Sequence, residues 1–189
     1  MNLTLPRLED TLALPSHLSR KSRRMTKQAD ESKRKGIFDR TTRGRSTTPV
    51  TLQVERGQIR FFAQVLGETD PIHSDVARAR ACGHPDLVAP PSFFMVLEAL
   101  ANEQLVRLGE VSAVTLVGCD YRYLLHGDER YDYRGLVYAG DELTLTTHVV
   151  DFYDKKGGAL EFVTFRSIVT HEQRGVLIST TRNLLHRLA

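Results

Sequence analysis

The sequence contains no tryptophan, only two cysteines and no long apolar run. Cys82 and Cys119 are too few and too far apart for a disulfide framework or a zinc site, so we interpret them as reduced, buried thiols. A membrane helix needs roughly 18 apolar residues in a row, which no segment approaches. The first residues also lack the basic, apolar and small-residue order of a secretory signal. We therefore expect a cytoplasmic protein with no membrane partner.

The charges are distributed unevenly along the chain. Residues 1–48 hold 12 Lys and Arg against 5 Asp and Glu, whereas the remainder holds 14 against 18. Residues 1–46 also show no sustained helical or alternating apolar period, so they bury too little apolar surface to offset their ordering entropy. We predict a basic, disordered N-terminal extension over 1–46 and one domain over 47–189. Basic tails are more often solvated extensions than nucleic-acid arms, so we do not expect nucleic acid as a partner.

The first part of the predicted domain combines one strand with three helical segments. Residues 50–54 alternate between apolar and polar, which predicts a strand, and apolar residues at helical spacing over 59–66 predict a helix. A second short helix is predicted over 74–81. A longer helix starts at about Pro91, because the missing N–H of proline costs nothing in the first turn. It is nearly apolar on all sides through Leu100, which is typical of a helix wrapped by other structure.

The C-terminal half has the pattern of consecutive strands. The predicted strands cover 113–123, 131–137, 141–153, 160–171 and 176–187. Turn signals separate them at Gly127-Asp128, Gly140-Asp141, Gly157-Gly158 and Arg174-Gly175, and we interpret Gly140-Asp141 as a hairpin turn. Short links imply an antiparallel sheet, whose apolar face needs a cover. We therefore predict an α+β protein with a single hot-dog fold, in which a curled antiparallel sheet wraps around one central helix.

The segment from Gly67 to His73 reads Gly-Glu-Thr-Asp-Pro-Ile-His. It resembles the signature of the MaoC-like (R)-specific hydratases and dehydratases, Gly-Asp-x-Asn-Pro-[Leu/Ile]-His. Glu68 stands where that class has its catalytic Asp, and Asp70 stands where it has Asn. The five-residue step from the acid to the histidine is preserved.

The resemblance continues beyond this signature. The run Ala89-Pro90-Pro91-Ser92-Phe93 is similar to the start of the central helix in the fatty-acid-synthase-type dehydratase branch, also called the MaoC dehydratase N-terminal branch. With the blocks at 125–133 and 138–143, the resemblance covers about residues 47–187. It implies a hot-dog fold and chemistry on acyl thioesters.

That chemistry requires two proton-transfer groups and a donor for the negative charge that develops on the thioester oxygen. His73 suits a proton-transfer role because an ordinary imidazole titrates near neutrality, although a histidine can also simply fill a core. Glu68 is one methylene longer than the Asp of the family, and Asp70 is the alternative carboxylate. Either can instead be a turn-former or a helix cap. We place Glu68 ahead of Asp70.

The resemblance implies an oxyanion site near the start of the central helix, where free amides and the helix dipole favour a developing anion. Pro90 and Pro91 have no N–H, so we expect Ala89, Ser92 or Phe93 to supply the donor. The alternative to an oxyanion site is an ordinary helix start that binds no ligand.

The resemblance also places His126 along the thioester channel, although a lone histidine beside Gly-Asp is more often a turn residue. The remaining histidines show no ligand spacing. We therefore expect neither a metal nor a cofactor.

The resemblance implies a 3-hydroxyacyl-thioester dehydratase or (R)-specific enoyl-thioester hydratase, with coenzyme A or acyl-carrier-protein substrates, that forms at least a homodimer. One alternative is a non-catalytic acyl-binding subunit of a heteromeric dehydratase, because the Asp and Asn positions of the signature are both replaced. A less favoured alternative is an acyl thioesterase, in which Glu98 or Glu103 on the central helix would activate water.

Overall fold

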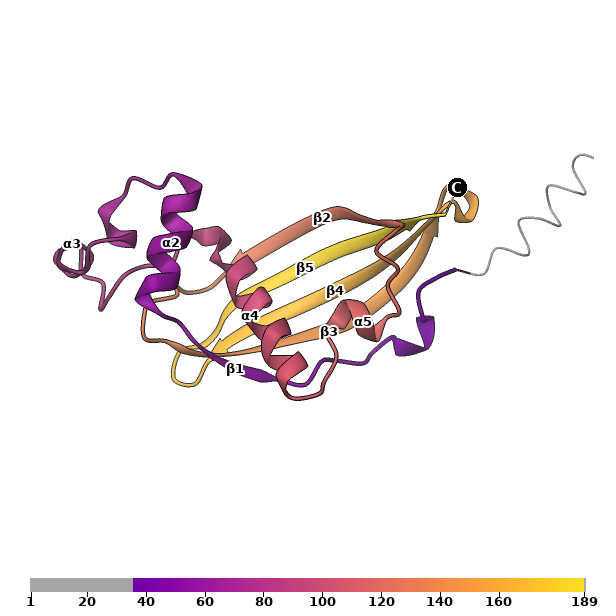
Figure 1. The fold of residues 1–189 in the computed structure, drawn as a ribbon, viewed down its shortest axis with the longest axis horizontal. Helices are drawn as coiled ribbons and strands as arrows, with labels where there is room; N and C mark the ends of the chain where they lie inside the picture. The colour runs from indigo at the N-terminus through magenta and orange to yellow at the C-terminus, as the bar shows by residue number, and fades with distance from the viewer. Residues whose placement is uncertain (1–35, 189) are drawn as a thin grey trace, which may run out of the picture. The chain divides into compact units, whose positions relative to one another are not determined.

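The computed structural model describes residues 36–188, which belong to one compact unit starting at Gly36. Its centre is a five-stranded antiparallel sheet in the order β1-β3-β4-β5-β2. The strands are β1 (Val50–Gln53), β2 (Leu124–Tyr133), β3 (Glu142–Lys155), β4 (Leu160–His171) and β5 (Gly175–Arg187). The sheet curls, and the helix α4 (Phe94–Arg107) lies across one face of it (Figure 1). The predicted α+β fold, a curled sheet with a central helix, is confirmed.

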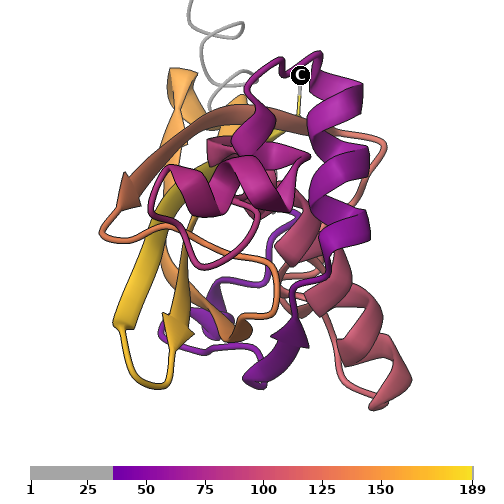
Figure 2. The ribbon, with the colours of Figure 1, turned by 90° about the vertical axis from the view of Figure 1, so that its left-hand side faces the viewer.

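The other helices gather at the two ends of the sheet. At one end lie α2 (Arg56–Leu66) and α3 (Val76–Ala81), in front of the sheet in the turned view of Figure 2. The short α5 (Ala113–Leu116) lies toward the other end (Figure 1). Single 3-10 turns complete the unit: η1 (Arg40–Thr42), η2 (Pro71–His73), η3 (Pro91–Phe93) and η4 (Lys156–Gly158).

Local signals start and end the helices that lead to the site. Glu55 and Gln58 form a capping box at the start of α2, and α2 ends at Gly67, whose φ of 73° is a left-handed conformation that glycine adopts without strain. Asp75 starts α3 by accepting the N–H groups of Ala77 and Arg78. The helices predicted over 59–66 and 74–81 are thereby confirmed.

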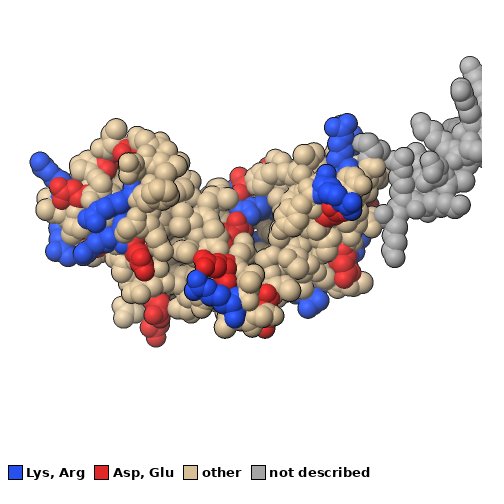
Figure 3. Space-filling model, in the orientation of Figure 1, with Lys and Arg blue, Asp and Glu red and all other residues tan. Residues whose placement is uncertain are grey.

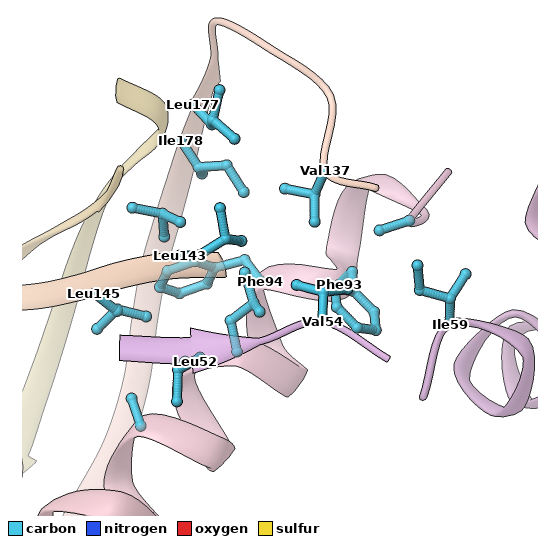
Figure 4. Packing of buried hydrophobic residues seen from close by; sticks show 14 of the residues in the cluster. Leu52, Val54, Ile59, Phe93, Phe94, Val137, Leu143, Leu145, Leu177 and Ile178 are labelled. Carbon is cyan, nitrogen blue, oxygen red and sulfur yellow. The ribbon is translucent and has the colours of Figure 1, made fainter. Parts of the chain in front are cut away.

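The central helix packs its buried side chains into the main core. These side chains recur at helical spacing and are Phe94, Leu97, Ala101 and Leu105. Figure 4 shows Phe94 and its neighbour Phe93 between Leu143 of β3 and Ile59 of α2. The helix starts through η3 at Pro91, as predicted. It is not wrapped on all sides, because Met95 is 46% exposed and Val106 is 72% exposed.

The segment predicted as a strand over 113–123 is instead the helical turn α5 followed by a loop. Ser112 starts this turn by accepting the N–H of Thr115. The error arose because a short apolar run of β-branched residues fits a buried helical turn as well as a strand. Val117, at the end of α5, is fully buried in a second core that the sequence pattern did not separate from the first.

The predicted turn at Gly127-Asp128 is also wrong, and the strand predicted over 131–137 is correct only for 131–133, the end of the longer β2. Gly127 lies inside β2, where the register to β5 shifts between His126 and Asp128. A Cβ at Gly127 would lie 2.8 Å from the backbone oxygen of Asn183, so the glycine marks a bulge where two backbones approach closely. β2 ends at Tyr133, and the chain then forms a loop. The glycine correctly indicated an irregularity of the backbone at this position, but a glycine does not distinguish a bulge within a strand from a turn between strands.

Gly140-Asp141 forms a turn, since the Asp141 N–H donates to the Tyr138 carbonyl, but it is not a hairpin. The strands on either side, β2 and β3, do not pair with each other: β2 pairs with β5 and β3 pairs with β1 and β4. Instead Tyr138 forms an isolated bridge with Val88. The loop 134–141 is thereby joined to the segment that precedes α4.

The folded unit begins at Gly36 rather than at residue 47, so the predicted disorder is wrong for 36–46, while residues 1–35 lie outside the described part. The anchor is Phe38, which is 5% exposed and stacks on the ring of His186 at 3.9 Å. The buried Glu161 carboxylate accepts the N–H groups of Ile37 and Phe38 at 2.6 and 3.1 Å. A single anchoring aromatic produces no period, so the sequence pattern could not reveal this contact.

Candidate active site

A cavity of about 450 Å³ opens beside η2, the turn between α2 and α3. Its walls come from η2, the segment before α4, the start of α4, the loop 134–137 and β5. This volume lies in the range of about 300–1,000 Å³ that is typical of small-molecule sites. The lining is apolar except for the side chains of His73, His84 and Tyr133.

His73 has a fixed orientation and tautomer. It is the last residue of η2, is 8% exposed and places Nδ1 2.6 Å from the carbonyl oxygen of Val88. A carbonyl oxygen can only accept, so Nδ1 carries the proton, and Nε2 of the neutral imidazole is the free base. The Val88 N–H in turn donates to the Ile72 carbonyl at 3.0 Å, which ties the two segments together. The arrangement suits proton abstraction by Nε2.

The two carboxylates of the signature do not line this cavity. Asp70 is exposed and accepts the Ile72 N–H at 3.0 Å as the N-cap of η2, which is the capping alternative raised from the sequence. Glu68 is also exposed, and within residues 36–188 its carboxylate has no hydrogen bond or ion pair. The structure thus brings His73 to the cavity and leaves both candidate acids outside the lining.

The candidate oxyanion amides differ in their availability. The Ala89 N–H donates to the Val137 carbonyl and the Phe93 N–H to the Pro90 carbonyl, both at 2.9 Å. The side chains of these two residues line the cavity. The Ser92 N–H has no acceptor among the described residues, although Ser92 itself is exposed and outside the lining. Ser92 is therefore the one of the three predicted donors whose amide remains free.

His126 lies on β2, outside the cavity lining, with Nε2 3.4 Å from a carboxylate oxygen of Glu129. Glu129 belongs to a charged cluster on the helix-facing side of the sheet, in which Arg182 binds Glu129 at 2.7 Å and Glu98 at 2.8 Å. Glu98 also lines a separate cavity of only about 20 Å³. Glu103, the other thioesterase candidate, is exposed and pairs with its own helix neighbour.

Sequence reasoning missed His84 and Tyr133. The Tyr133 hydroxyl donates to the Pro91 carbonyl at the start of the central helix. Burial, with a smaller contribution from the negative charge of Glu129, raises the pKa of the Tyr133 phenol. The alternation of β2 could have placed Tyr133 on the same face as Tyr131, but His84 stands in a loop that has no local signal for a site.

Figure 3 shows basic side chains gathered at the end of the unit that carries α2 and α3, with acidic side chains beside them. Within residues 36–188, no group of three or more His, Cys, Asp or Glu is arranged to hold a metal ion. In the same part of the chain, no helix has the length and apolar character needed to cross a membrane.

The curled antiparallel sheet with its central helix defines a hot-dog protein. Residues 41–181 match the family model of the FAS1-like dehydratase domain region, and the chain belongs to that family. A UPF0336 protein of Leifsonia xyli is 40% identical over 127 residues, which cover 67% of this chain and 80% of that relative.

Solved structures share the fold at lower identity. The HadBC (3R)-hydroxyacyl-ACP dehydratase complex of Mycobacterium tuberculosis matches with a TM-score of 0.60 and 22% identity, covering 76% of this chain and 96% of that chain. The R-hydratase PhaJ1 of Pseudomonas aeruginosa matches with a TM-score of 0.53 and 15% identity, covering 78% and 83%. At these identities the comparison shows the hot-dog fold.

Proposed function

We propose that this chain is a 3-hydroxyacyl-thioester dehydratase, or (R)-specific enoyl-thioester hydratase, in which His73 moves the proton of the water that is added or lost. One observation carries the proposal: a histidine with a free Nε2 lies in the wall of an otherwise apolar cavity of about 450 Å³. The cavity accepts an apolar acyl chain, and among the three candidate proton-transfer residues of the signature, Glu68, Asp70 and His73, the histidine lines it.

In the hydration direction, Nε2 of His73 takes a proton from water while the water oxygen bonds to the β carbon of the enoyl thioester. Electron density then moves toward the thioester oxygen, and we propose that the Ser92 N–H donates to this oxygen. The proposal is supported by the absence of an acceptor for that N–H among the described residues at the start of the central helix. Apolar walls strengthen both interactions because they lower the local dielectric constant. Dehydration follows the same path in reverse.

The substrate carrier, coenzyme A or an acyl carrier protein, bears phosphate groups. The basic side chains at the cavity end of the unit favour a carrier of this kind (Figure 3). They include Arg60 and Arg78 of α2 and α3, neither of which pairs with a carboxylate within residues 36–188. The apolar side chains Met95 and Val106, exposed on α4, support at least a homodimer that covers this helix.

The test follows the absorbance of a conjugated enoyl thioester, with crotonyl-coenzyme A and a longer trans-2-enoyl homologue as substrates. We expect wild type to consume the signal and His73→Ala to lower kcat by a factor of about 10²–10⁴, which is the contribution of a general base. His148→Ala is the matched control, because His148 lies outside the cavity and bonds Ser46. Equal rates for wild type and His73→Ala would reject the proposed role of His73.

A second candidate function is a non-catalytic acyl-binding subunit. It is favoured by the position of Glu68 and Asp70 outside the cavity lining and by the likeness to HadBC, which is a complex. In that case the purified chain is inactive alone and raises the activity of a catalytic MaoC-like partner. His73→Ala would leave the activity of that assembly unchanged, whereas filling the cavity would abolish the contribution of this chain.

A further inference from the structure

The cavity contains a second imidazole, that of His84. The loop that carries it is held by its backbone: the His84 N–H donates to the Ala79 carbonyl at 3.1 Å, and Arg80 Nε donates to the Pro85 carbonyl at 3.2 Å. The His84 ring packs against the ring of Tyr138, with centroids 5.9 Å apart. His84 lines the cavity and is only partly buried.

The proposed reaction needs one proton-transfer group near the α carbon and one near the β carbon of the thioester. The cavity has few polar side chains that could take these roles. His73 can serve the β carbon through Nε2. The Tyr133 hydroxyl is committed to the Pro91 carbonyl and holds its proton tightly. The carboxylates of the signature lie outside the lining. Among the lining side chains, the His84 imidazole is the remaining group that can both donate and accept a proton.

We propose that His84 is the second catalytic residue and supplies the proton at the α carbon; this inference rests on the proposed function. In hydration, His73 Nε2 takes a proton from water and the water oxygen forms the bond to the β carbon. The electron pair of the carbon–carbon double bond then takes a proton from the His84 imidazolium at the α carbon. The products are the 3-hydroxyacyl thioester, a protonated His73 and a neutral His84. Exchange with solvent restores the starting protonation states.

The pairing of two imidazoles suits an apolar cavity. One positive charge is present before the reaction, on His84, and one is present after it, on His73. The step therefore moves a positive charge from His84 to His73 and leaves the net charge of the cavity unchanged. This matters because an apolar environment strongly disfavours the creation of an unpaired charge. Because His84 is partly exposed, it can recover its proton directly from water.

The test compares His84→Ala and His84→Gln with wild type, each purified as the full chain, in the enoyl-thioester assay. We expect kcat to fall by a factor of about 10²–10⁴ with KM within a few-fold of wild type. Added imidazole should restore part of kcat in His84→Ala, where the removed ring leaves space, but not in His84→Gln. His148→Ala is the control for removing a histidine elsewhere, and Glu68→Gln measures the alternative acid directly.

The outcomes separate this inference from the proposed function. Activity of His84→Gln within about threefold of wild type, with Glu68→Gln impaired by the factor expected of a general acid, would assign the second role to Glu68 and overturn the inference. A folded His84→Ala that loses kcat without imidazole rescue, or that changes KM alone, also counts against it. A wild-type chain inactive alone and with any partner overturns the proposed function and the role of His84 with it.

Discussion

Replacing Glu161 by alanine tests how the start of the folded unit is attached to the sheet. Glu161 and His186 are both fully buried, and the His186 Nδ1–H lies 2.9 Å from the Glu161 carboxylate. The same carboxylate oxygen accepts the N–H groups of Ile37 and Phe38. The His186 Nε2 accepts the N–H of Asp120. Glu161 is thus the common acceptor of three donors, two of them buried and that of Ile37 partly buried, from two distant parts of the chain.

The expected loss of unfolding free energy depends on the donors that Glu161→Ala leaves without an acceptor. A hydrogen bond to a charged group contributes about 1.5–3 kcal/mol, but removing the carboxylate also removes the cost of burying its charge. Leaving a buried donor without its acceptor costs about 1–3 kcal/mol, and Glu161→Ala removes the acceptor of three donors. After the offset from no longer burying the carboxylate charge, we expect a loss of about 3–5 kcal/mol. For a domain of about 150–250 residues, each kcal/mol shifts Tm by about 2–4 °C. The expected decrease in Tm is therefore about 6–20 °C.

Urea unfolding followed by circular dichroism measures the change in the free energy of unfolding. Glu103→Ala is the matched control, because it makes the same substitution in an exposed i,i+4 pair with Arg107. Such a pair contributes about 0.3–0.5 kcal/mol. A loss below about 1 kcal/mol for Glu161→Ala would refute the reasoning that this carboxylate holds the buried donors. Limited proteolysis of the variant should also cleave near residues 36–46.

Two further predictions concern acid stability and the bulge in β2. The Arg56 guanidinium, hydrogen-bonded to Asp86, lowers the pKa of that carboxyl to about 2. Its unfolded value is about 3.9, so the stabilisation is present above that pH and is lost as the pH falls toward about 2. Asp86→Asn should therefore show a weaker decrease of unfolding free energy between about pH 4 and 2 in urea titrations, and an unchanged slope would contradict this. Gly127→Ala should cost about 1–3 kcal/mol, because its Cβ meets the Asn183 backbone, which cannot move aside as a flexible side chain would; a neutral result in thermal unfolding would show that the bulge relaxes.

The spacing of apolar residues predicted helices and strands correctly wherever an element packs one continuous face against the core. The helix over 59–66, the start of the central helix at Pro91 and the long strands from 141 onward all follow their predicted patterns. The errors lie where a short run fits two structures, as at 113–123, or where a glycine serves a long-range backbone contact, as at Gly127. Local patterns carry no information about which distant segment approaches.

In the candidate site, too, the features carried by neighbouring residues were predictable from the sequence, and those that depend on distant residues were not. The signature around His73 was readable because its residues are neighbours in sequence, and the structure places that histidine in the cavity. Its tautomer depends on the Val88 carbonyl, which lies 15 residues away along the chain. Whether Ala89, Ser92 or Phe93 has a free amide depends equally on the distant Val137 and on the turn at Pro90.

By itself, the sequence determined the hot-dog fold, the dehydratase-like signature and His73 as the residue to test, because these rest on short-range periods and a contiguous motif. Only the tertiary structure decided that His84 shares the cavity, that Asp70 is a cap and that Glu161 holds the segment from Gly36. The Asp70 cap is local, but the contacts of Glu161 with Ile37 and Phe38 and the place of His84 beside Tyr133 in the cavity wall join residues far apart in the chain. Their geometry is set by how the sheet curls and where the loops pack, which no local pattern encodes.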